Sequence, residues 1–314
     1  MRRAVIVGAG GQDGRILYEQ LKSRGYAIVG IGRKTLKTTG TEYSGVSVDI
    51  ADFGQVCKLL TDFQPHEVYY LAAVHQAAQD PQTDELALFQ KSYQVNVDYL
   101  VHFLEAIRRQ AVQSRLFYAA SSHIFGDGTS TLQDEATPIN PVCVYGITKA
   151  AGMLACRYYR EKYAVFATTG ILYNHESIYR SPNFVSKKII QGAMDIKQGR
   201  EEKLVLGDLR AAIDWGYAPD YVEAMQGLLK IDVPGEYIVA TGESHTVQEF
   251  AQIAFSLLDL DWRKYISEDA KLIKKPSFLR IGNPQKLFAA TGWKPQTDFK
   301  QMIEALLIDE GAFD

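Results

Sequence analysis

A short run of β-branched residues at the N-terminus, AVIVG, leads into three glycines spaced three residues apart: Gly8, Gly11 and Gly14. An amphipathic stretch with apolar residues at helical spacing follows directly, so the order predicts a strand, a tight turn and a helix. Glycine lets the backbone approach a pyrophosphate, and the amides of a helix N-terminus bind anions. The turn is therefore typical of a dinucleotide site, although a glycine turn that binds nothing has the same pattern.

Strand and helix patterns then alternate for about 170 residues. Strands are expected at 27–33, 45–50, 67–73, 115–121 and 166–172, and helices at 53–63, 88–110 and 146–163. Parallel neighbours need a crossover connection, so the alternation predicts an α/β fold with a Rossmann-type doubly wound parallel sheet. The pattern loosens after residue 173. We predict a dinucleotide-binding domain over 1–173, to which a segment at about 213–241 returns, and a smaller C-terminal α/β substrate-binding lobe over 174–314.

Composition and charge exclude several classes of protein. The 314 residues carry a net charge of -3 without long blocks of like charge, which predicts no nucleic-acid or membrane partner. No apolar run reaches the roughly 18 residues that span a bilayer. Three cysteines without CxxC spacing and scattered histidines predict neither a disulfide framework nor a metal site. We expect a reducing compartment, the cytoplasm.

Charged residues after the expected strands bear on the choice of cofactor. The second strand ends in GIGRK, without the acidic residue that binds a ribose 2′-hydroxyl, while Arg33 and Lys34 suit a 2′-phosphate. This favours NADP over NAD, unless the two residues are a solvated surface pair. Asp49, at the end of the third strand, is placed either to accept from the adenine amino group or to cap a turn.

The sequence YGITK places Tyr145 and Lys149 one helical turn apart. A nearby ammonium lowers the pKa of a phenol, so such a tyrosine can exchange a proton with a substrate hydroxyl during hydride transfer. Ser121 and Ser122 end the preceding strand, where a hydroxyl can hold the substrate oxygen. A tyrosine and lysine at this spacing also occur by chance, and the glycine turn upstream supports the functional interpretation.

Several motifs together are similar to those of a known family. In order, GAGGQDG, VDI, YLAA, ASSHIFG and YGITK resemble extended short-chain dehydrogenases/reductases that act on nucleotide sugars. The longer segments ILYNHESIYRSPNFVSKKI, LGDLRAAIDWGYAPDYVEAM and YIVATGESHTVQEF resemble GDP-mannose 4,6-dehydratases. The resemblance covers nearly the whole chain. It implies oxidation of the sugar at C4 by NADP+, removal of the C5 proton, loss of water from C6 and return of hydride to C6.

The resemblance also assigns residues. The catalytic residues that it implies are Ser121, His123, Tyr145 and Lys149, with Tyr145 as the C4 base and Lys149 lowering its pKa and binding the nicotinamide ribose. Turn and resemblance together give the expected cofactor-binding residues, which are Gly8, Gly11, Gln12, Asp13, Gly14, Arg33, Lys34, Asp49, Ile50, Leu71, Ala72, Ala73, His75, Tyr145, Lys149, His175 and Arg180. The expected substrate-binding residues are Ser122, Asn174, Asn183, Lys187, Arg210 and Lys275. A solvated position on a helix is an alternative for Lys187.

One departure from the family pattern affects the chemistry most. His123 stands where the dehydratases carry their catalytic glutamate. An imidazole, with an unperturbed pKa of about 6.5, can serve as general base and acid. The alternatives are a reaction confined to C4, as in a 4-keto-sugar reductase, a C4 oxidase or an epimerase, or a packing role for the ring. Outside enzymes, the alternative is a cofactor-binding regulatory protein that has lost catalysis.

Other departures affect the substrate. Ile178, Tyr179 and Ile213 replace a proline and two arginines of the family, although Arg210 lies close to the last of these positions. KKPSF replaces an arginine-proline stretch, so Lys275 would meet the diphosphate as a point charge. We therefore expect a nucleotide-diphosphate sugar, GDP-linked by resemblance, whose sugar is a hexose or a heptose. Two apolar helices, around residues 95–107 and 145–163, predict a homodimer or homotetramer, with packing in the core as the alternative.

Overall fold

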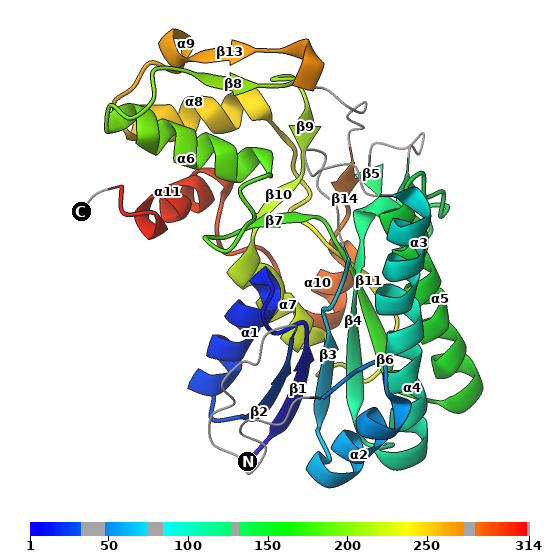
Figure 1. Cartoon of the computed structure of the whole chain (residues 1–314). Coiled ribbons are helices and arrows are strands. Elements are labelled where there is room, and N and C mark those ends of the chain that lie inside the picture. The colour runs from blue at the N-terminus through cyan, green and yellow to red at the C-terminus, as the bar shows by residue number, and fades with distance from the viewer. Residues whose placement is uncertain (33–47, 75–83, 127–131, 273–279, 313–314) are drawn as a thin grey trace.

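The computed structural model describes residues 1–32, 48–74, 84–126, 132–272 and 280–312. Its centre is a parallel six-stranded sheet in the order β11-β6-β4-β3-β1-β2 (Figure 1). The strands are β1 (Arg3–Val7), β2 (Ala27–Ile31), β3 (Glu67–Tyr70), β4 (Arg115–Ser121), β6 (Ala167–Leu172) and β11 (Glu236–Val239). The strand order reverses at β1, because β2 lies on one side of it and β3 on the other. The predicted doubly wound fold is confirmed.

Helices cover both faces of this sheet, as buried parallel strands require. α1 (Gln12–Ser23) packs against α7 (Ala218–Leu228), while α2 (Phe53–Phe63), α4 (Tyr99–Gln110) and α5 (Val144–Tyr163) lie together on the opposite face (Figure 1). β1 from Ala4 to Val7 has no exposed surface, as do Val68 to Tyr70 of β3. Burial on both faces explains why these strands are continuous apolar runs rather than alternating ones.

The predicted helix at 88–110 is interrupted. α3 (Glu85–Tyr93) passes into a π-helical turn (Gln94–Asp98) before α4 begins. The turn carries Asn96, whose side chain is fully buried. A π-helical turn adds a residue to the helix and redirects a side chain, which frequently happens at functional sites.

A second hydrophobic core lies at the upper end of the molecule in Figure 1, beyond the carboxyl ends of the sheet strands. α6 (Val185–Lys197), α8 (Val247–Leu257) and α11 (Phe299–Asp309) form it around the rings of Trp215, Phe250 and Phe299. Short strand pairs surround it: β8 (Leu204–Leu206) with β13 (Ile266–Glu268), β9 (Ala212–Ile213) with β12 (His245–Thr246), and β7 (Asn174–Glu176) with β10 (Trp215–Tyr217). The remaining elements are β5 (Leu132–Gln133) paired with β14 (Ile281–Gly282), α9 (Trp262–Tyr265), α10 (Gln285–Thr291), and 3-10 turns at Ser122–Phe125 and Ala270–Leu272.

The segments 213–241 and 45–50 bear on the predicted organisation of the chain. β11 pairs with β6 at the edge of the large sheet and α7 covers a face of it, so most of the segment 213–241 lies with the first core. The predicted division near residue 173 remains a prediction. Half of the expected strand at 45–50 lies outside the described residues, and its described half, from Val48 to Ile50, is not a strand. Within the described ranges, no helix combines the length and apolar character needed to cross a membrane.

Candidate active site

The glycine turn joins β1 to α1 at the carboxyl edge of the sheet. Gly8 has φ +94°, and a Cβ there would lie 2.6 Å from the backbone nitrogen of Ala72. A Cβ on Gly14 would lie 2.4 Å from the carbonyl oxygen of Gly8. Both positions therefore need glycine, one for backbone conformation and close approach, the other for packing of the helix on the turn. Leu71 to Ala73 follow β3 beside this turn, as expected.

The N-terminus of α1 has the features of an anion site. Its first residue is preceded by Gly11, and no side chain caps the helix there, in contrast to α2, where Asp52 accepts from two amides. Uncapped amides and the positive end of the helix dipole attract a pyrophosphate. The site lies where the strand order reverses, between β1 and β3, which is the usual position of a ligand in an open α/β sheet. These residues fit a bound dinucleotide.

The carboxyl end of β4 brings the expected catalytic residues together. The Ser121 hydroxyl accepts from the His123 amide at 3.3 Å and hydrogen bonds with Tyr145. The His123 ring stands edge to face against the Tyr145 ring, with centroids 5.7 Å apart and an interplanar angle of 81°. Ser122 is buried at the start of the same 3-10 turn. The structure thus places a phenol, a hydroxyl and an imidazole side by side.

The ionisation of Tyr145 and Lys149 is set mainly by burial. Burial raises the pKa of Tyr145 to about 12, against the charge of Arg180 and the hydrogen bond from Ser121, which lower it. Burial lowers the pKa of Lys149 to about 7, with the charge of Asp13 acting in the opposite direction. The Lys149 Nζ donates to the carbonyl of Ala119 at 2.7 Å and lies 5.7 Å from the centre of the Tyr145 ring. The charge of Arg180 lowers the pKa of Tyr145 here. The expected action of Lys149 on that pKa remains a prediction.

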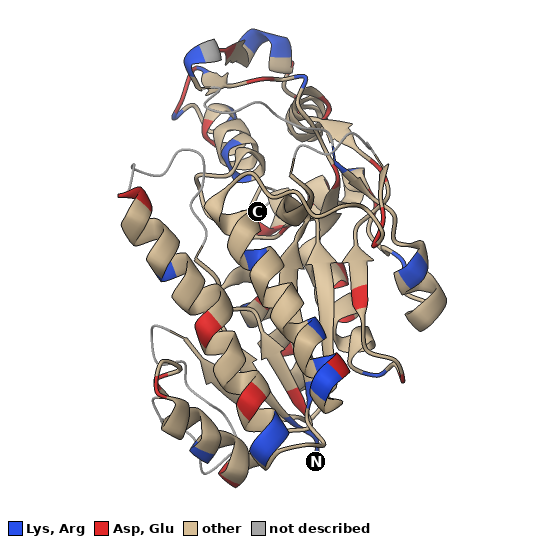
Figure 2. Ribbon diagram, turned by 90° about the vertical axis from the view of Figure 1, so that its right-hand side faces the viewer, with Lys and Arg blue, Asp and Glu red and all other residues tan. Residues whose placement is uncertain are grey.

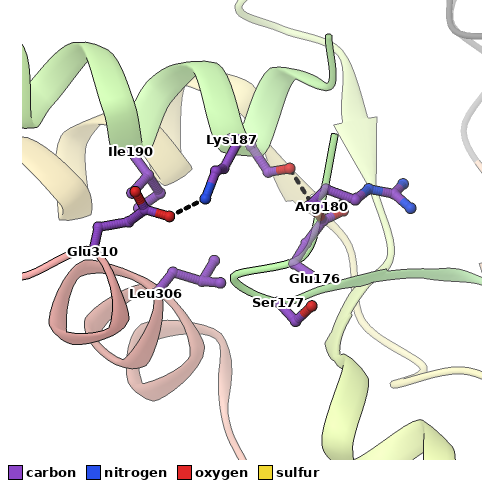
Figure 3. Close-up of a pocket in the computed structure, with 8 residues that line it drawn as sticks. Glu176, Ser177, Arg180, Lys187, Ile190, Leu306 and Glu310 are labelled. Carbon is purple, nitrogen blue, oxygen red and sulfur yellow. Dashed lines mark hydrogen bonds and ion pairs between the residues drawn. The ribbon is translucent and has the colours of Figure 1, made fainter. Parts of the chain in front are cut away.

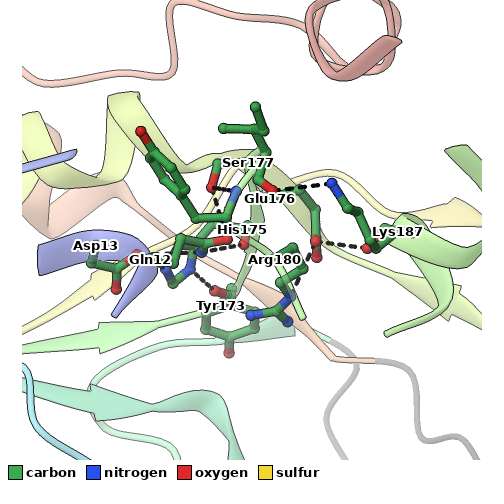
Figure 4. Close-up of polar contacts among 11 residues, drawn as sticks. Gln12, Asp13, Tyr173, His175, Glu176, Ser177, Arg180 and Lys187 are labelled. Atoms are coloured by element: carbon green, nitrogen blue, oxygen red, sulfur yellow. Dashed lines mark hydrogen bonds and ion pairs between the residues drawn. The ribbon is translucent and has the colours of Figure 1, made fainter. Parts of the chain in front are cut away.

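An ion pair crosses from α1 to β7. His175 Nε2 lies 2.9 Å from Asp13 Oδ1, and His175 Nδ1 lies 2.7 Å from the carbonyl oxygen of Tyr173 (Figure 4). Both partners only accept hydrogen bonds, so both ring nitrogens donate and the ring is an imidazolium. Burial lowers the pKa of His175, but the charge and hydrogen bond of Asp13 outweigh it, so this pKa is raised. The pKa of Asp13 is lowered because His175 outweighs its burial.

Gln12 strengthens the same connection. Its amide nitrogen donates to the His175 carbonyl at 3.0 Å, and its amide oxygen accepts from the Ser177 hydroxyl at 3.0 Å. The residues after the glycine turn that were expected to bind the cofactor therefore also fix β7 against α1. The imidazole of His175 is fully engaged by protein groups, and its ring stacks on Tyr221 with centroids 4.7 Å apart.

Arg180 lies near the cluster formed by Ser121, His123 and Tyr145. Its Nε is 3.1 Å from Glu176 Oε2 (Figure 4). Its guanidinium stacks on the Phe184 ring, 3.7 Å from the ring centre. Its charge acts on both Tyr145 and Asp13. Its expected role at the cofactor remains a prediction.

The expected substrate-binding residues are only partly brought together. Asn174 begins β7, half-buried, next to His175. Asn183 is exposed just before α6. Lys187 is paired with Glu310, which follows α11, and also donates to the carbonyl of Ile178 at 3.0 Å.

Figure 3 shows that the Lys187–Glu310 pair lines a small pocket between β7, α6 and α11. The cavity measures about 10 Å³, the space of one water molecule, so it does not hold a sugar nucleotide. Arg210 lies apart from this group, with a side chain that is 91% exposed and 3.5 Å from Asp208. Contact of Lys187 with a ligand would require its pair with Glu310 to open.

The remaining expected residues lie at the periphery or beyond the described chain. Asp49 is exposed, and its carboxylate accepts from the Ala51 amide at 3.0 Å, which is the turn-capping alternative. Ile50 is half-buried, and its carbonyl meets His102 Nδ1 at 2.9 Å. The residues that lie outside the described ranges are Arg33, Lys34, His75 and Lys275. Among the residues that the structure describes, no three His, Cys, Asp or Glu side chains gather as metal ligands would.

Sequence reasoning missed two buried polar residues that organise the site. Asn96 donates to the Thr148 hydroxyl at 2.8 Å and accepts from the Val74 amide at 3.2 Å, which ties the segment after β3 to the residue before Lys149. Asp214, between β9 and β10, accepts from Thr241 and Gly242 in the loop after β11 and from Gly282 in β14. The available signal was a polar residue inside an apolar run: Asn96 in VNVDYL, and Asp214 before a tryptophan.

Comparison with known proteins agrees with this geometry. A family model described as GDP-mannose 4,6 dehydratase matches residues 5–306. A protein named GDP-mannose 4,6 dehydratase 2 from Arabidopsis thaliana is 34% identical over 327 aligned positions, covering 98% of this chain and 86% of its own length. A GDP-mannose 4,6-dehydratase from Vibrio cholerae is 30% identical, covering 98% of this chain and 93% of its own length.

Solved structures share the fold at lower identity. RMD from Pseudomonas aeruginosa, complexed with NADPH, superposes with a TM-score of 0.82 at 20% identity and covers 99% of both chains. A dTDP-glucose 4,6-dehydratase from Bacillus anthracis, in complex with NAD, superposes with a TM-score of 0.80 at 18% identity, covering 100% of this chain and 97% of the other. Sequence and fold agree, and the chain belongs to the GDP-mannose 4,6-dehydratase family.

Proposed function

We propose that this protein dehydrates GDP-mannose or a related GDP-linked hexose or heptose at C4 to C6, with His123 in the place of the family glutamate. The observation that carries the proposal is the position of His123 beside Tyr145, with ring centroids 5.7 Å apart. A group that acts on C5 of a sugar must lie next to the group that acts on C4, because the two carbons are bonded. The two rings meet this requirement.

Tyr145 takes the proton of the C4 hydroxyl. It does so as the phenolate, after its own proton has passed to solvent. Burial raises the pKa of this phenol to about 12, so the phenolate depends on nearby groups that favour it. Arg180 supplies positive charge, and Ser121 supplies a hydrogen bond that also orients the phenol. A nicotinamide dinucleotide held at the glycine turn would supply the hydride acceptor for C4 and the hydride donor for C6.

His123 handles the proton of the elimination. Once C4 is a ketone, the C5–H bond breaks toward the imidazole, which becomes imidazolium. The same proton then passes to the C6 hydroxyl, which leaves as water. The ring returns to its neutral form. Hydride addition at C6 is then completed by a proton at C5, which comes from solvent and balances the proton that the C4 hydroxyl gave up. Ser121 and the edge-to-face contact with Tyr145 hold the ring for both transfers.

We propose NADP as the cofactor. The preference over NAD rests on Arg33 and Lys34, which follow the second strand in sequence. The uncapped N-terminus of α1 and the two glycines that exclude a Cβ support a pyrophosphate in either case. Both imidazole nitrogens of His175 are already hydrogen-bonded, to Tyr173 and to Asp13. His175 and Asp13 would therefore support the shape of this site, and the imidazole nitrogens would not contact the cofactor. Three free cysteines fit the cytoplasm as its location.

We also propose that the protein is a homodimer or homotetramer. α3 and α5 pack against each other, and each exposes large apolar side chains. We call the surface formed by these side chains the α3–α5 face. Its residues are Leu86, Phe89 and Tyr93 on α3, and Ile147, Leu154 and Tyr158 on α5. Figure 2 looks onto these helices, where charged residues are sparse. A contiguous apolar surface of this kind is typical of a protein interface.

A reaction confined to C4 is the second candidate function. The imidazole at position 123 favours it, because a ring differs from a carboxylate in reach and charge. A 4-keto-sugar reductase, C4 oxidase or epimerase would need only Tyr145, Ser121 and the nicotinamide. In that case His123 would shape the pocket without exchanging a proton.

Incubation with GDP-mannose and NADP+ in D2O, followed by mass spectrometry and NMR of the product, separates these functions. Dehydration removes one water and places solvent deuterium at C5. Redox chemistry at C4 alone keeps water and the C5 proton, and a non-catalytic protein changes nothing. His123→Ala should abolish water loss but keep C4 oxidation, whereas Tyr145→Phe should abolish both. Water loss at the wild-type rate in His123→Ala would contradict the role of the imidazole.

A further inference from the structure

A thiol touches the imidazole that we place at C5. Cys143 is the N-cap of α5, and its Sγ accepts from the Gly146 amide at 3.4 Å. The same sulfur lies 3.8 Å from His123 Nδ1, within hydrogen-bond range for sulfur. Cys143 therefore joins the start of the helix that carries Tyr145 to the ring that stands beside it.

We propose that Cys143 is a positioning residue for His123, with its sulfur accepting from Nδ1–H. This contact holds the ring in one orientation and one tautomer, with the unshared pair on Nε2, the nitrogen that takes the C5 proton. The inference rests on the proposed function in assigning that proton to His123. The contact itself does not depend on the reaction.

The helix explains why the sulfur accepts rather than donates. An N-cap group faces amides whose hydrogens point toward it, and the positive end of the helix dipole stabilises electron density on the cap. Cys143 Sγ already accepts one amide hydrogen there. A second donor, Nδ1–H, is a fitting partner for the same atom. Protein ligands that orient a functional imidazole act in the same way, by accepting from the second ring nitrogen.

The backbone around His123 is fixed as well. Its carbonyl lies against Gly146, where a Cβ would approach to 2.5 Å, and its amide donates to Ser121. With the Tyr145 ring against one edge, the His123 side chain retains mainly rotation about its Cα–Cβ and Cβ–Cγ bonds. The sulfur at Nδ1 restricts this rotation and sets which nitrogen is protonated.

Distance makes the role specific for sulfur. An oxygen acceptor at 3.8 Å from nitrogen would not form a hydrogen bond. The oxygen of a serine lies closer to its own Cβ than a sulfur does, so a serine at this position would lie still farther from Nδ1. Serine is nevertheless a good N-cap. Cys143→Ser thus keeps the helix cap and removes the imidazole partner, whereas Cys143→Ala removes both.

The experiment compares full-length wild type, Cys143→Ser and Cys143→Ala. For Cys143→Ser we expect a Tm within about 2 °C of wild type, an unchanged KM for GDP-mannose, and water loss slowed about tenfold. C4 oxidation, followed at 340 nm in a single turnover with NADP+, should stay within about twofold. Cys143→Ala should lose water as slowly as Cys143→Ser but melt at a lower temperature, since only the alanine variant lacks the cap.

Histidine nitrogen NMR provides a readout that needs no reaction. Wild type should show His123 with Nδ1 protonated and Nε2 unprotonated, with Cys143→Ser giving a mixture of tautomers. The inference is overturned if Cys143→Ser loses water at the wild-type rate, if C4 oxidation falls in the same proportion, or if the tautomer is unchanged. If wild type removes no water, the proposed function fails, and the NMR comparison then decides the inference alone.

Discussion

Replacing Lys149 by Met should stabilise the protein by an amount that depends strongly on pH. The lysine is 1% exposed, and burial lowers its pKa from 10.5 to about 7. Between these values the unfolded chain binds a proton that the folded chain does not, so the stability of the wild type rises with pH. At 1.36 kcal/mol per pKa unit, the lysine costs roughly 5 kcal/mol at pH 6 and roughly 2 kcal/mol at pH 9.

Urea denaturation at both pH values measures this cost. The stability gained by Lys149→Met should be about 3 kcal/mol larger at pH 6 than at pH 9. Its lost hydrogen bond to Ala119 and the packing of methionine contribute equally at both pH values and cancel in the comparison. Lys22→Met on the surface of α1 is the control and should change stability by less than about 0.5 kcal/mol at either pH. An equal gain at pH 6 and pH 9 in Lys149→Met would refute the argument that burial lowers this pKa.

Three further predictions follow from other contacts. Gly14→Ala should lower the free energy of unfolding by about 1 to 3 kcal/mol, because its Cβ would lie 2.4 Å from a backbone oxygen. Gly10→Ala is the control: its Cβ would have nothing within 4 Å, so the free energy of unfolding should change by less than about 0.5 kcal/mol. Equal urea midpoints of the two variants would contradict this. Asp13→Asn should bring the pKa of His175 below its ordinary value, because burial then acts without the carboxylate, and an unchanged NMR titration would exclude the ion pair. In the wild type that pair stabilises fully between about pH 4 and pH 6.5. Its contribution is lost as pH rises through the raised pKa of His175 and as pH falls through the lowered pKa of Asp13, so the variant should show a flatter pH profile of stability. Leu154→Glu on the α3–α5 face should reduce the mass in sedimentation equilibrium without changing the circular dichroism, and an unchanged mass would place the interface elsewhere.

Local patterns in the sequence determined the elements of this fold. The helix expected at 53–63 and the strand expected at 115–121 have those bounds in the structure. Tyr145 and Lys149 lie on one helix, as their spacing predicted. These features depend on periodicity, caps and glycine conformation, which act over a few residues. The alternation of strands and helices then leaves few topologies for a parallel sheet, because crossover connections are right-handed and short.

Tertiary structure alone decided which polar groups meet. Asp13 and His175 are 162 residues apart in sequence, and Lys187 and Glu310 are 123 apart. Each of these residues has an ordinary local pattern, so nothing nearby indicates its partner. Cys143 and His123 are 20 residues apart, and they meet because the N-terminus of α5 packs against the 3-10 turn that follows β4. Burial, which raises the pKa of Tyr145 and lowers that of Lys149, is likewise a property of the packed molecule, because it depends on how completely other elements exclude water.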